Sequence, residues 1–288
     1  MLHPENVRIG SLNFDVWTAG PEAGEPVMLL HGWPQDGLVW EETAELLAAD
    51  GFRVIAPDQR GYSPDARPEG AENYHIDLLA NDVLSIGSAM GAESFHLAGH
   101  DWGSAVSWWL AGHYPDRVRS LTAVSIPHLA AFGRAVATDA DQQQRSSYMD
   151  LFREPGAAES ALMDNDGAGL QFVYGKDITH GSIVRLVTRF SEPGAMTASL
   201  NWYRAMGSDM ARLPNVTVPT TYVWGNDDMA AGRVGAEMCA SFVDGDYRFV
   251  EIEAGHWLPD THPALIATEI AARARGIAPG ATSAEPVV

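Results

Sequence analysis

Leu97-Ala98-Gly99-His100-Asp101-Trp102-Gly103 is the stretch that decides the fold of this chain. Its form, with one residue between the central aspartate and each glycine, is typical of a sharp turn that joins a strand to a helix. Residues 94–98 predict a short buried strand, and residues 104–113 predict a helix. Both glycines have a steric reason, because the turn is tight and the helix must pack close to the strand. The sequence therefore predicts a strand–turn–helix unit with Asp101 at its tip.

The aspartate at this tip indicates the kind of carbon that the chain attacks. A serine that attacked a saturated carbon would leave an ether, whereas a carboxylate leaves an ester that activated water can hydrolyse. Asp101 therefore favours epoxides or alkyl halides over the substrates of a serine esterase. The amides at the helix N-terminus favour its ionised form. The alternative, a structural aspartate in an inactive protein, is disfavoured because partner residues are also present.

Composition predicts a protein with one sizeable core. The chain has 288 residues, of which 46% are hydrophobic and nine are tryptophan, enough for one core or for a core with an inserted cap. Acidic residues outnumber basic ones by 38 to 18, and the net charge of -20 argues against nucleic acids and anionic membranes as partners. Cys239 is the single cysteine, so no intramolecular disulfide can form, and we expect it to be a small buried helix residue.

The first residues of the chain and its apolar runs indicate the cellular location that we expect for the protein. Residues 1–6 lack a basic region followed by an apolar one, and no apolar run is long enough to cross a bilayer. We therefore expect a cytoplasmic protein, either a monomer or a homodimer.

Strand and helix patterns alternate along most of the chain, which predicts a mainly parallel sheet with helices on both faces. The first element is a hairpin with a turn near Gly10. The strands expected after it are 27–30, 53–57, 120–126, 220–224 and 247–252, and the further helices are one around 40–47, then 76–90, 234–242 and 261–275.

Residues 127–213 break this alternation. The segment is helical in pattern, with loops near 154–156, 164–169 and 192–194. We expect it to be a helical cap inserted over the carboxyl edge of the sheet, where open α/β sheets bind ligands. The predicted division is a core of residues 1–126 and 214–276, a cap of residues 127–213 and a disordered tail of residues 277–288.

Five motifs carry a resemblance that covers about residues 7–275. They are His31-Gly32-Trp33-Pro34, Asp58-Gln59-Arg60-Gly61-Tyr62, Gly99-His100-Asp101-Trp102-Gly103, Trp224-Gly225-Asn226-Asp227-Asp228 and Gly255-His256-Trp257. With these motifs in this order, the chain resembles the α/β-hydrolases of the epoxide hydrolase and haloalkane dehalogenase branch. The resemblance implies an α/β-hydrolase fold with an inserted helical cap. It implies no metal and no organic cofactor, and His31 and His100 lack neighbours at metal-ligand spacing.

His256 and Asp228 are the expected partners of Asp101. His256 lies in a loop between a strand and a helix and is the candidate general base that activates water. Asp228 is the candidate acid that orients His256, with its neighbour Asp227 as the rival. The spacing of the family, three residues after Gly225, falls on Asp228. The order of nucleophile, acid and base agrees with this fold.

Two tryptophans mark the expected oxyanion hole. The groups that would stabilise the oxyanion are the backbone amides at Trp33 and Trp102, so the side chains are not required for this role. The side chain of Trp33 can also form a wall of the pocket.

Two tyrosines favour an epoxide as the substrate. Tyr148 begins the stretch 148–156, which is similar to the cap motif Tyr-x-x-x-Phe-Gln-x-Pro-Gly of epoxide hydrolases, with Arg153 in place of glutamine. Tyr203 lies in Asn201-Trp202-Tyr203-Arg204, which resembles the second cap motif. A phenol is neutral at pH 7 and can protonate the oxygen of an opened epoxide. The alternative is that both tyrosines are core residues of the cap.

These patterns together predict an epoxide hydrolase. Asp101 would form an ester with a small hydrophobic epoxide, and water activated by His256 would release a vicinal diol. One alternative is a haloalkane or haloacid dehalogenase with the same triad, for which Trp102 and another tryptophan (Trp108, Trp109 or Trp202) would bind the halide. Many dehalogenases, however, carry asparagine where this chain has Trp33. A more distant alternative is a hydrolase-fold protein that binds a small molecule without turning it over.

Overall fold

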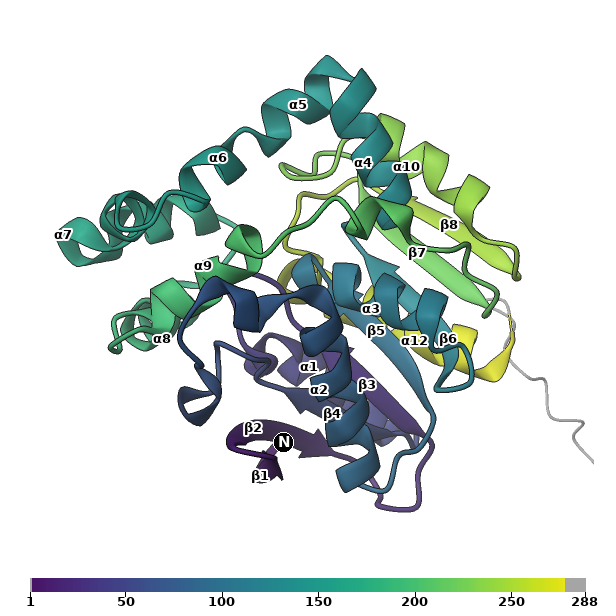
Figure 1. Ribbon diagram of the computed structural model, residues 1–288. Helices are drawn as coiled ribbons and strands as arrows, with labels where there is room; N and C mark the ends of the chain where they lie inside the picture. The colour runs from purple at the N-terminus through teal and green to yellow at the C-terminus, as the bar shows by residue number, and fades with distance from the viewer. Residues whose placement is uncertain (1, 278–288) are drawn as a thin grey trace, which may run out of the picture.

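The centre of the computed structural model, which describes residues 2–277, is an eight-stranded sheet (Figure 1). The strand order is β1-β2-β4-β3-β5-β6-β7-β8. The pairs β1·β2 and β2·β4 are antiparallel, and the other pairs are parallel. The strands are β1 (His3–Ile9), β2 (Leu12–Ala19), β3 (Pro26–Leu30), β4 (Arg53–Pro57), β5 (Phe95–His100), β6 (Val118–Val124), β7 (Thr220–Gly225) and β8 (Tyr247–Ile252). The predicted mainly parallel sheet is confirmed.

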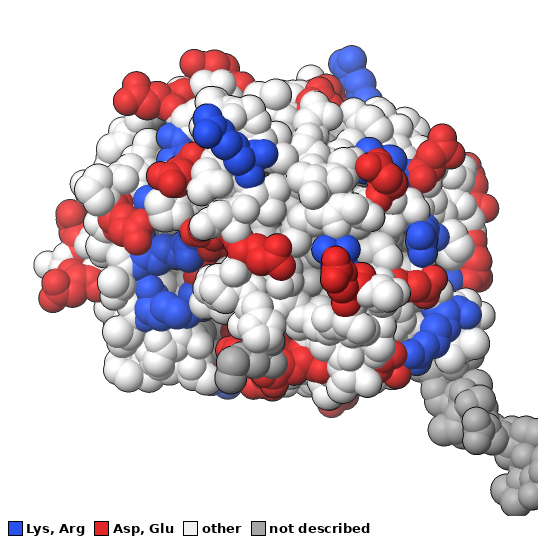
Figure 2. Space-filling view, turned by 90° about the horizontal axis from the view of Figure 1, so that it is seen from below, with Lys and Arg blue, Asp and Glu red and all other residues white. Residues whose placement is uncertain are grey.

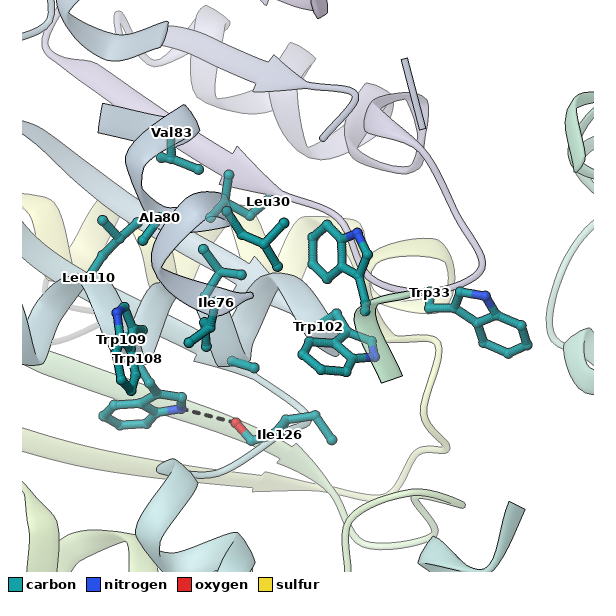
Figure 3. Close-up of a cluster of buried hydrophobic side chains, with 14 of the residues drawn as sticks. Leu30, Trp33, Ile76, Ala80, Val83, Trp102, Trp108, Trp109, Leu110 and Ile126 are labelled. Carbon is teal, nitrogen blue, oxygen red and sulfur yellow. Dashed lines mark hydrogen bonds between the residues drawn. The ribbon is translucent and has the colours of Figure 1, made fainter. Parts of the chain in front are cut away.

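Helices cover both faces of this sheet because its central strands are apolar on both sides. In β3, Val27 and Leu29 pack into the core cluster under α1 and α12, whereas Met28 and Leu30 pack into the cluster under α2 and α3. The helices outside the middle segment are α1 (Glu41–Ala49), α2 (Ile76–Ala89), α3 (Trp102–His113), α10 (Arg233–Met238), α11 (Leu258–Thr261) and α12 (Pro263–Arg275). Figure 3 shows part of the second cluster, in which the indole of Trp108 donates to the Ile126 carbonyl (3.1 Å).

Several element boundaries differ from those expected from sequence. Strand β6 ends at Val124, because Ser125 takes a positive φ of 72°. The helix expected at 261–275 is divided after Thr261, since the residue before Pro263 is disfavoured in a helical conformation. Cys239 is buried, as expected, but begins a short 3-10 helix after α10. Of the expected tail, residues 278–288 lie outside the described part of the chain.

The segment between β6 and β7 is helical and lies over the carboxyl edge of the sheet (Figure 1). Its helices are α4 (Leu129–Thr138), α5 (Ala140–Ser146), α6 (Tyr148–Phe152), α7 (Ala157–Tyr174), α8 (His180–Phe190) and α9 (Ala195–Arg204). The breaks fall in the expected loops, at 153–156 and 191–194, and α7 is kinked where Asn165, Asp166 and Gly167 have positive φ. Helix α4 packs against α10 of the core.

Charge on the surface is mixed. Figure 2 shows acidic and basic side chains interspersed over one face, so the excess negative charge is spread over that face. Among the helices formed by residues 2–277, none has both the length and the apolar character that a membrane span requires.

Two arginines of α8 attach the middle segment to the core. Arg189 contacts Asp58 (2.6 Å) and Asp36 (3.3 Å), and Arg185 also pairs with Asp36. Both aspartates are completely buried. Burial and the nearby Asp36 raise the pKa of Asp58 to about 6, although Arg189 opposes this shift. The buried carboxylates therefore depend on α8 for their counter-charge.

We predict that Arg189→Met destabilises the protein by about 3–5 kcal/mol, because it removes one partner of a buried ion pair. Thr188→Met is the matched control, since Thr188 is the exposed neighbour on the same helix. Denaturant unfolding of the two variants measures the difference. Equal unfolding free energies would contradict a stabilising role for the ion pair.

Candidate active site

Asp101 lies at the tip of the predicted turn, between β5 and α3. Its backbone has φ 53° and ψ -120°, a conformation that costs a non-glycine residue energy and persists only where the surroundings enforce it. A Cβ on Gly99 would overlap with the carbonyl oxygen of Gly103, and a Cβ on Gly103 would overlap with that of Leu30. The chain therefore needs both glycines for this close packing, as the sequence predicts.

The loop after β3 contacts Asp101 directly. The Trp33 amide donates to Asp101 Oδ1 (2.8 Å), and a Cβ on Gly32 would overlap with the Asp101 side chain. The amide of Trp102, the next residue, also lowers the pKa of Asp101. Both expected oxyanion-hole amides thus converge on one carboxylate, and the side chain of Trp33 is a wall of the neighbouring cavity.

His256 lies between two carboxylates. Its Nδ1 is 2.9 Å from Asp228 Oδ1, and its Nε2 is 3.6 Å from Asp101 Oδ2. The other oxygen of Asp228 accepts from the Ser125 hydroxyl (2.6 Å), which is also 2.9 Å from His256 Nδ1. Asp227, the rival in the sequence, is exposed. The structure therefore brings Asp228 to the imidazole.

The pKa values of the two aspartates shift in opposite directions. Burial alone would raise the pKa of Asp228, but His256, Ser125 and the Ala230 amide lower it to about 2. Burial raises the pKa of Asp101 more than His256 and the Trp102 and Trp33 amides lower it. The amides thus favour the ionised form of Asp101, as expected, but burial outweighs them. Burial also disfavours protonated His256, yet Asp228 and Asp101 raise its pKa above the ordinary value.

Tyr148 on α6 and Tyr203 on α9 face the same space as Asp101. Their ring centroids are 6.1 Å apart, and Tyr203 lies edge-on to Trp102 (5.2 Å). Burial is the main cause that raises the pKa of both phenols, and the charge of Asp101 adds to it. Both tyrosines are therefore neutral donors at ordinary pH. Arg153, the departure from the family motif, contacts the Tyr203 carbonyl (3.4 Å).

Two cavities meet at Asp101 and this tyrosine pair. The larger has a volume of about 360 Å³, and Asp101 and His256 are the charged residues among those that line it. The smaller, of about 40 Å³, lies on the side of α4. The larger is walled by Leu151, Phe152, Leu162, Phe172, Val173 and Trp257, and the smaller includes Met149, Met206 and Met210. An apolar space with a few convergent polar groups is typical of a small-molecule site.

The other histidines near Asp101 have structural contacts. His31 Nε2 accepts from the Gln59 amide (3.1 Å), and burial lowers the pKa of His31 to about 4. His100 Nε2 contacts the His256 carbonyl (2.8 Å), and burial lowers the pKa of His100 to about 3. Within residues 2–277, no three His, Cys, Asp or Glu side chains are grouped so that they could hold a metal ion.

Ser125 is the site residue that sequence reasoning missed. It belongs to none of the five motifs, and a serine at a strand end is common in any protein. The available signal was its position, since the residue after a parallel strand faces the carboxyl edge where ligands bind.

Comparison with known proteins places these residues in a family. A family model described as alpha/beta hydrolase fold matches residues 25–263. The AB hydrolase superfamily protein YfhM of Bacillus subtilis (strain 168) is 35% identical over 268 residues, which cover 90% of this chain and 93% of that protein. Epoxide hydrolase 4 of Mus musculus is 30% identical over 273 residues, with 90% and 76% covered. A solved structure titled as one of the novel epoxide hydrolases in metagenomes from hot environments is 27% identical, with a TM-score of 0.83 over 96% of this chain and 99% of that one.

We predict that Asp228→Asn lowers the pKa of His256 by about one to three, because it removes the opposite charge at Nδ1. Asp227→Asn, one residue away and exposed, is the matched control and should leave the His256 pKa unchanged. NMR titration of the imidazole resonances measures both. A larger shift in the Asp227 variant would reverse the assignment.

The same pKa shift makes stability depend on pH. Because the folded-state pKa of His256 is raised, its stabilising contribution is complete below the unfolded value of about 6.5. The contribution is lost as the pH rises through the folded-state pKa. Asp228→Asn should weaken this part of the pH dependence.

Proposed function

This chain belongs to the α/β hydrolase fold family, in its epoxide hydrolase branch, and on that premise we propose that it opens epoxides to vicinal diols through an ester on Asp101. One observation carries the proposal: a buried carboxylate, a pair of neutral phenols and a His–Asp pair converge on one apolar cavity. We also propose that residues 127–213 act as the cap, since Tyr148 and Tyr203 both belong to this segment.

In the first step, an Asp101 oxygen attacks a ring carbon and the bond between that carbon and the epoxide oxygen breaks. Tyr148 and Tyr203 hold the departing oxygen, and one of them gives it a proton that solvent later restores. Their raised pKa values keep both phenols protonated until this step. The product of the step is a hydroxyalkyl ester on Asp101.

In the second step, His256 removes a proton from water, which attacks the ester carbonyl carbon. The amides of Trp33 and Trp102 stabilise the oxyanion, since the Trp33 amide already donates to this carboxylate and the adjoining Trp102 amide lowers its pKa. The tetrahedral intermediate collapses, and the diol oxygen leaves with the proton held by His256. The oxygen from water stays in the Asp101 carboxyl group, whose remaining proton passes to solvent, and Asp228 stabilises the imidazolium while it exists.

The cavity supports a neutral apolar substrate. Apart from Asp101 and His256, the larger cavity is lined by uncharged residues, so an anionic group in the substrate would be buried there without a counter-charge. We therefore propose that the substrate is a small hydrophobic epoxide.

The indole groups favour this function over dehalogenation. A halide leaving group needs free N–H donors, but the indole of Trp202 donates to the Arg60 carbonyl (2.9 Å). The indole of Trp108 donates to the Ile126 carbonyl (3.1 Å), and that of Trp109 to Asp77 (2.9 Å). The three tryptophans that could accompany Trp102 as halide ligands are therefore already bonded within the protein.

We predict that the wild-type protein converts an aryl epoxide to its diol and releases no halide from a short alkyl chloride. The Tyr148→Phe/Tyr203→Phe variant should lose diol formation by about 10²- to 10⁴-fold, because the leaving oxygen has no acid. Tyr114→Phe, at the end of α3, is the matched control. Halide release that survives in the double variant, without any diol from the epoxide, would make the protein a dehalogenase.

His256→Gln should block the second step and leave the first intact. Incubation with the epoxide is expected to raise the intact mass of this variant by the mass of one substrate molecule. His262→Gln serves as the control, because His262 contacts Thr261 and no residue of the site. If the His256 variant keeps its original mass while the wild type forms diol, an ester is not the intermediate.

A further inference from the structure

Ser125 lies where β6 ends and joins two groups of the site. Its hydroxyl oxygen is 2.6 Å from Asp228 Oδ2 and 2.9 Å from His256 Nδ1, and the residue is completely buried. The same imidazole nitrogen is 2.9 Å from Asp228 Oδ1. The hydroxyl, the imidazole and the carboxylate therefore form one closed group.

Hydrogen-bond chemistry fixes the protons within this group. An ionised carboxylate only accepts, so the single hydroxyl proton of Ser125 goes to Asp228. The lone pairs of the hydroxyl then face His256 Nδ1, which must carry a proton shared between the hydroxyl and the carboxylate. In the neutral imidazole, Nε2, which faces Asp101 at 3.6 Å, is then the nitrogen without a proton. That nitrogen is the one that must act as the base.

The backbone of Ser125 is held in a conformation that serine rarely adopts. Its φ is 72°, in the left-handed region. Its amide donates to the Val223 carbonyl (2.9 Å), and its carbonyl accepts from the Tyr222 hydroxyl (2.7 Å). The Ile126 carbonyl accepts from Ser104 (2.7 Å) and Trp108 (3.1 Å). Strain that neighbours enforce in this way is common where a side chain must be aimed at a functional site.

Each oxygen of Asp228 has its own donors. Oδ1 accepts from the Ala230 and Ala231 amides (2.7 and 3.1 Å), whereas Oδ2 accepts from Ser125. Loss of the hydroxyl would leave Oδ2 without this donor and let the carboxylate turn, which would weaken its hold on the Nδ1 proton and so on the tautomer of the imidazole.

We infer that Ser125 is a positioning residue for the hydrolytic step, which holds Asp228 and fixes His256 in the tautomer that can accept a proton from water. The inference rests on the proposed function. The Ser125 hydroxyl bonds to Asp228 and His256 rather than to Asp101, Tyr148 or Tyr203, so it acts on ester hydrolysis and leaves ester formation unaffected.

The experiment measures the two steps separately, by rapid quenching of the full-length protein with an aryl epoxide and mass spectrometry of the ester. Ser125→Gly and Ser125→Ala both remove the hydroxyl, but glycine also relieves the backbone strain. We expect both variants to form the ester at nearly the wild-type rate and to hydrolyse it about 10- to 100-fold more slowly. Ser120→Ala is the matched control, because Ser120 is a buried serine within β6 that bonds to His96.

A structural role gives a different result. If backbone strain rather than the hydroxyl were the cause, Ser125→Ala, which keeps the strain, would hydrolyse the ester at the wild-type rate and only Ser125→Gly would differ, and the inference would be wrong. It would also be wrong if Ser120→Ala slowed hydrolysis as much as the Ser125 variants.

A measurement without substrate separates this inference from the proposed function. The ¹⁵N resonances of His256 should report one neutral tautomer in the wild type and a mixture in Ser125→Gly. If the wild type forms no diol but the tautomer changes as expected, the proposed function fails and the positioning of His256 by Ser125 stands. An unchanged tautomer in Ser125→Gly would overturn the inference.

Discussion

The close approach of three backbone segments around Asp101 is the constraint on which the rest of the structure depends. Side chains at Gly32 and Gly103 would overlap with Asp101 and with the Leu30 carbonyl, so both positions need glycine. This packing holds Asp101 at a positive φ and brings the Trp33 amide to 2.8 Å from its carboxylate. Asp101 is therefore fixed by the core alone, while the donors that face it from Tyr148 and Tyr203 come from the inserted segment.

A second consequence is that two buried aspartates with the same chemistry acquire different properties. Asp228 has four short donor contacts, from His256, Ser125, Ala230 and Ala231, and its pKa falls to about 2. Burial dominates at Asp101 and raises its pKa. When the surroundings shift the pKa values of two titratable groups in opposite directions, the two groups are expected to have different roles. In the proposed mechanism, one carboxylate stays charged to support His256 and the other becomes an ester.

Much of this could be predicted from sequence because it depends on local rules. The apolar run 27–30 and the glycines around Asp101 predicted the sheet and the turn, which the structure and the family comparisons confirm. From sequence, only motif spacing favoured Asp228 over Asp227. The difference in burial between them becomes visible only in the folded structure. Ser125 could not be found, because its role depends on three segments that meet in space. The ion pairs of Arg189 with Asp36 and Asp58 are equally non-local.

A single turnover in water enriched in ¹⁸O tests the central claim, attack by Asp101 on the substrate, most directly. With enzyme in excess over epoxide, the new diol oxygen should come from the Asp101 carboxylate, so the diol should contain no ¹⁸O. The peptide that carries Asp101 should gain one ¹⁸O atom from water. A diol labelled in this first turnover, with an unlabelled Asp101 peptide, would show that water attacks the epoxide directly and would contradict the account.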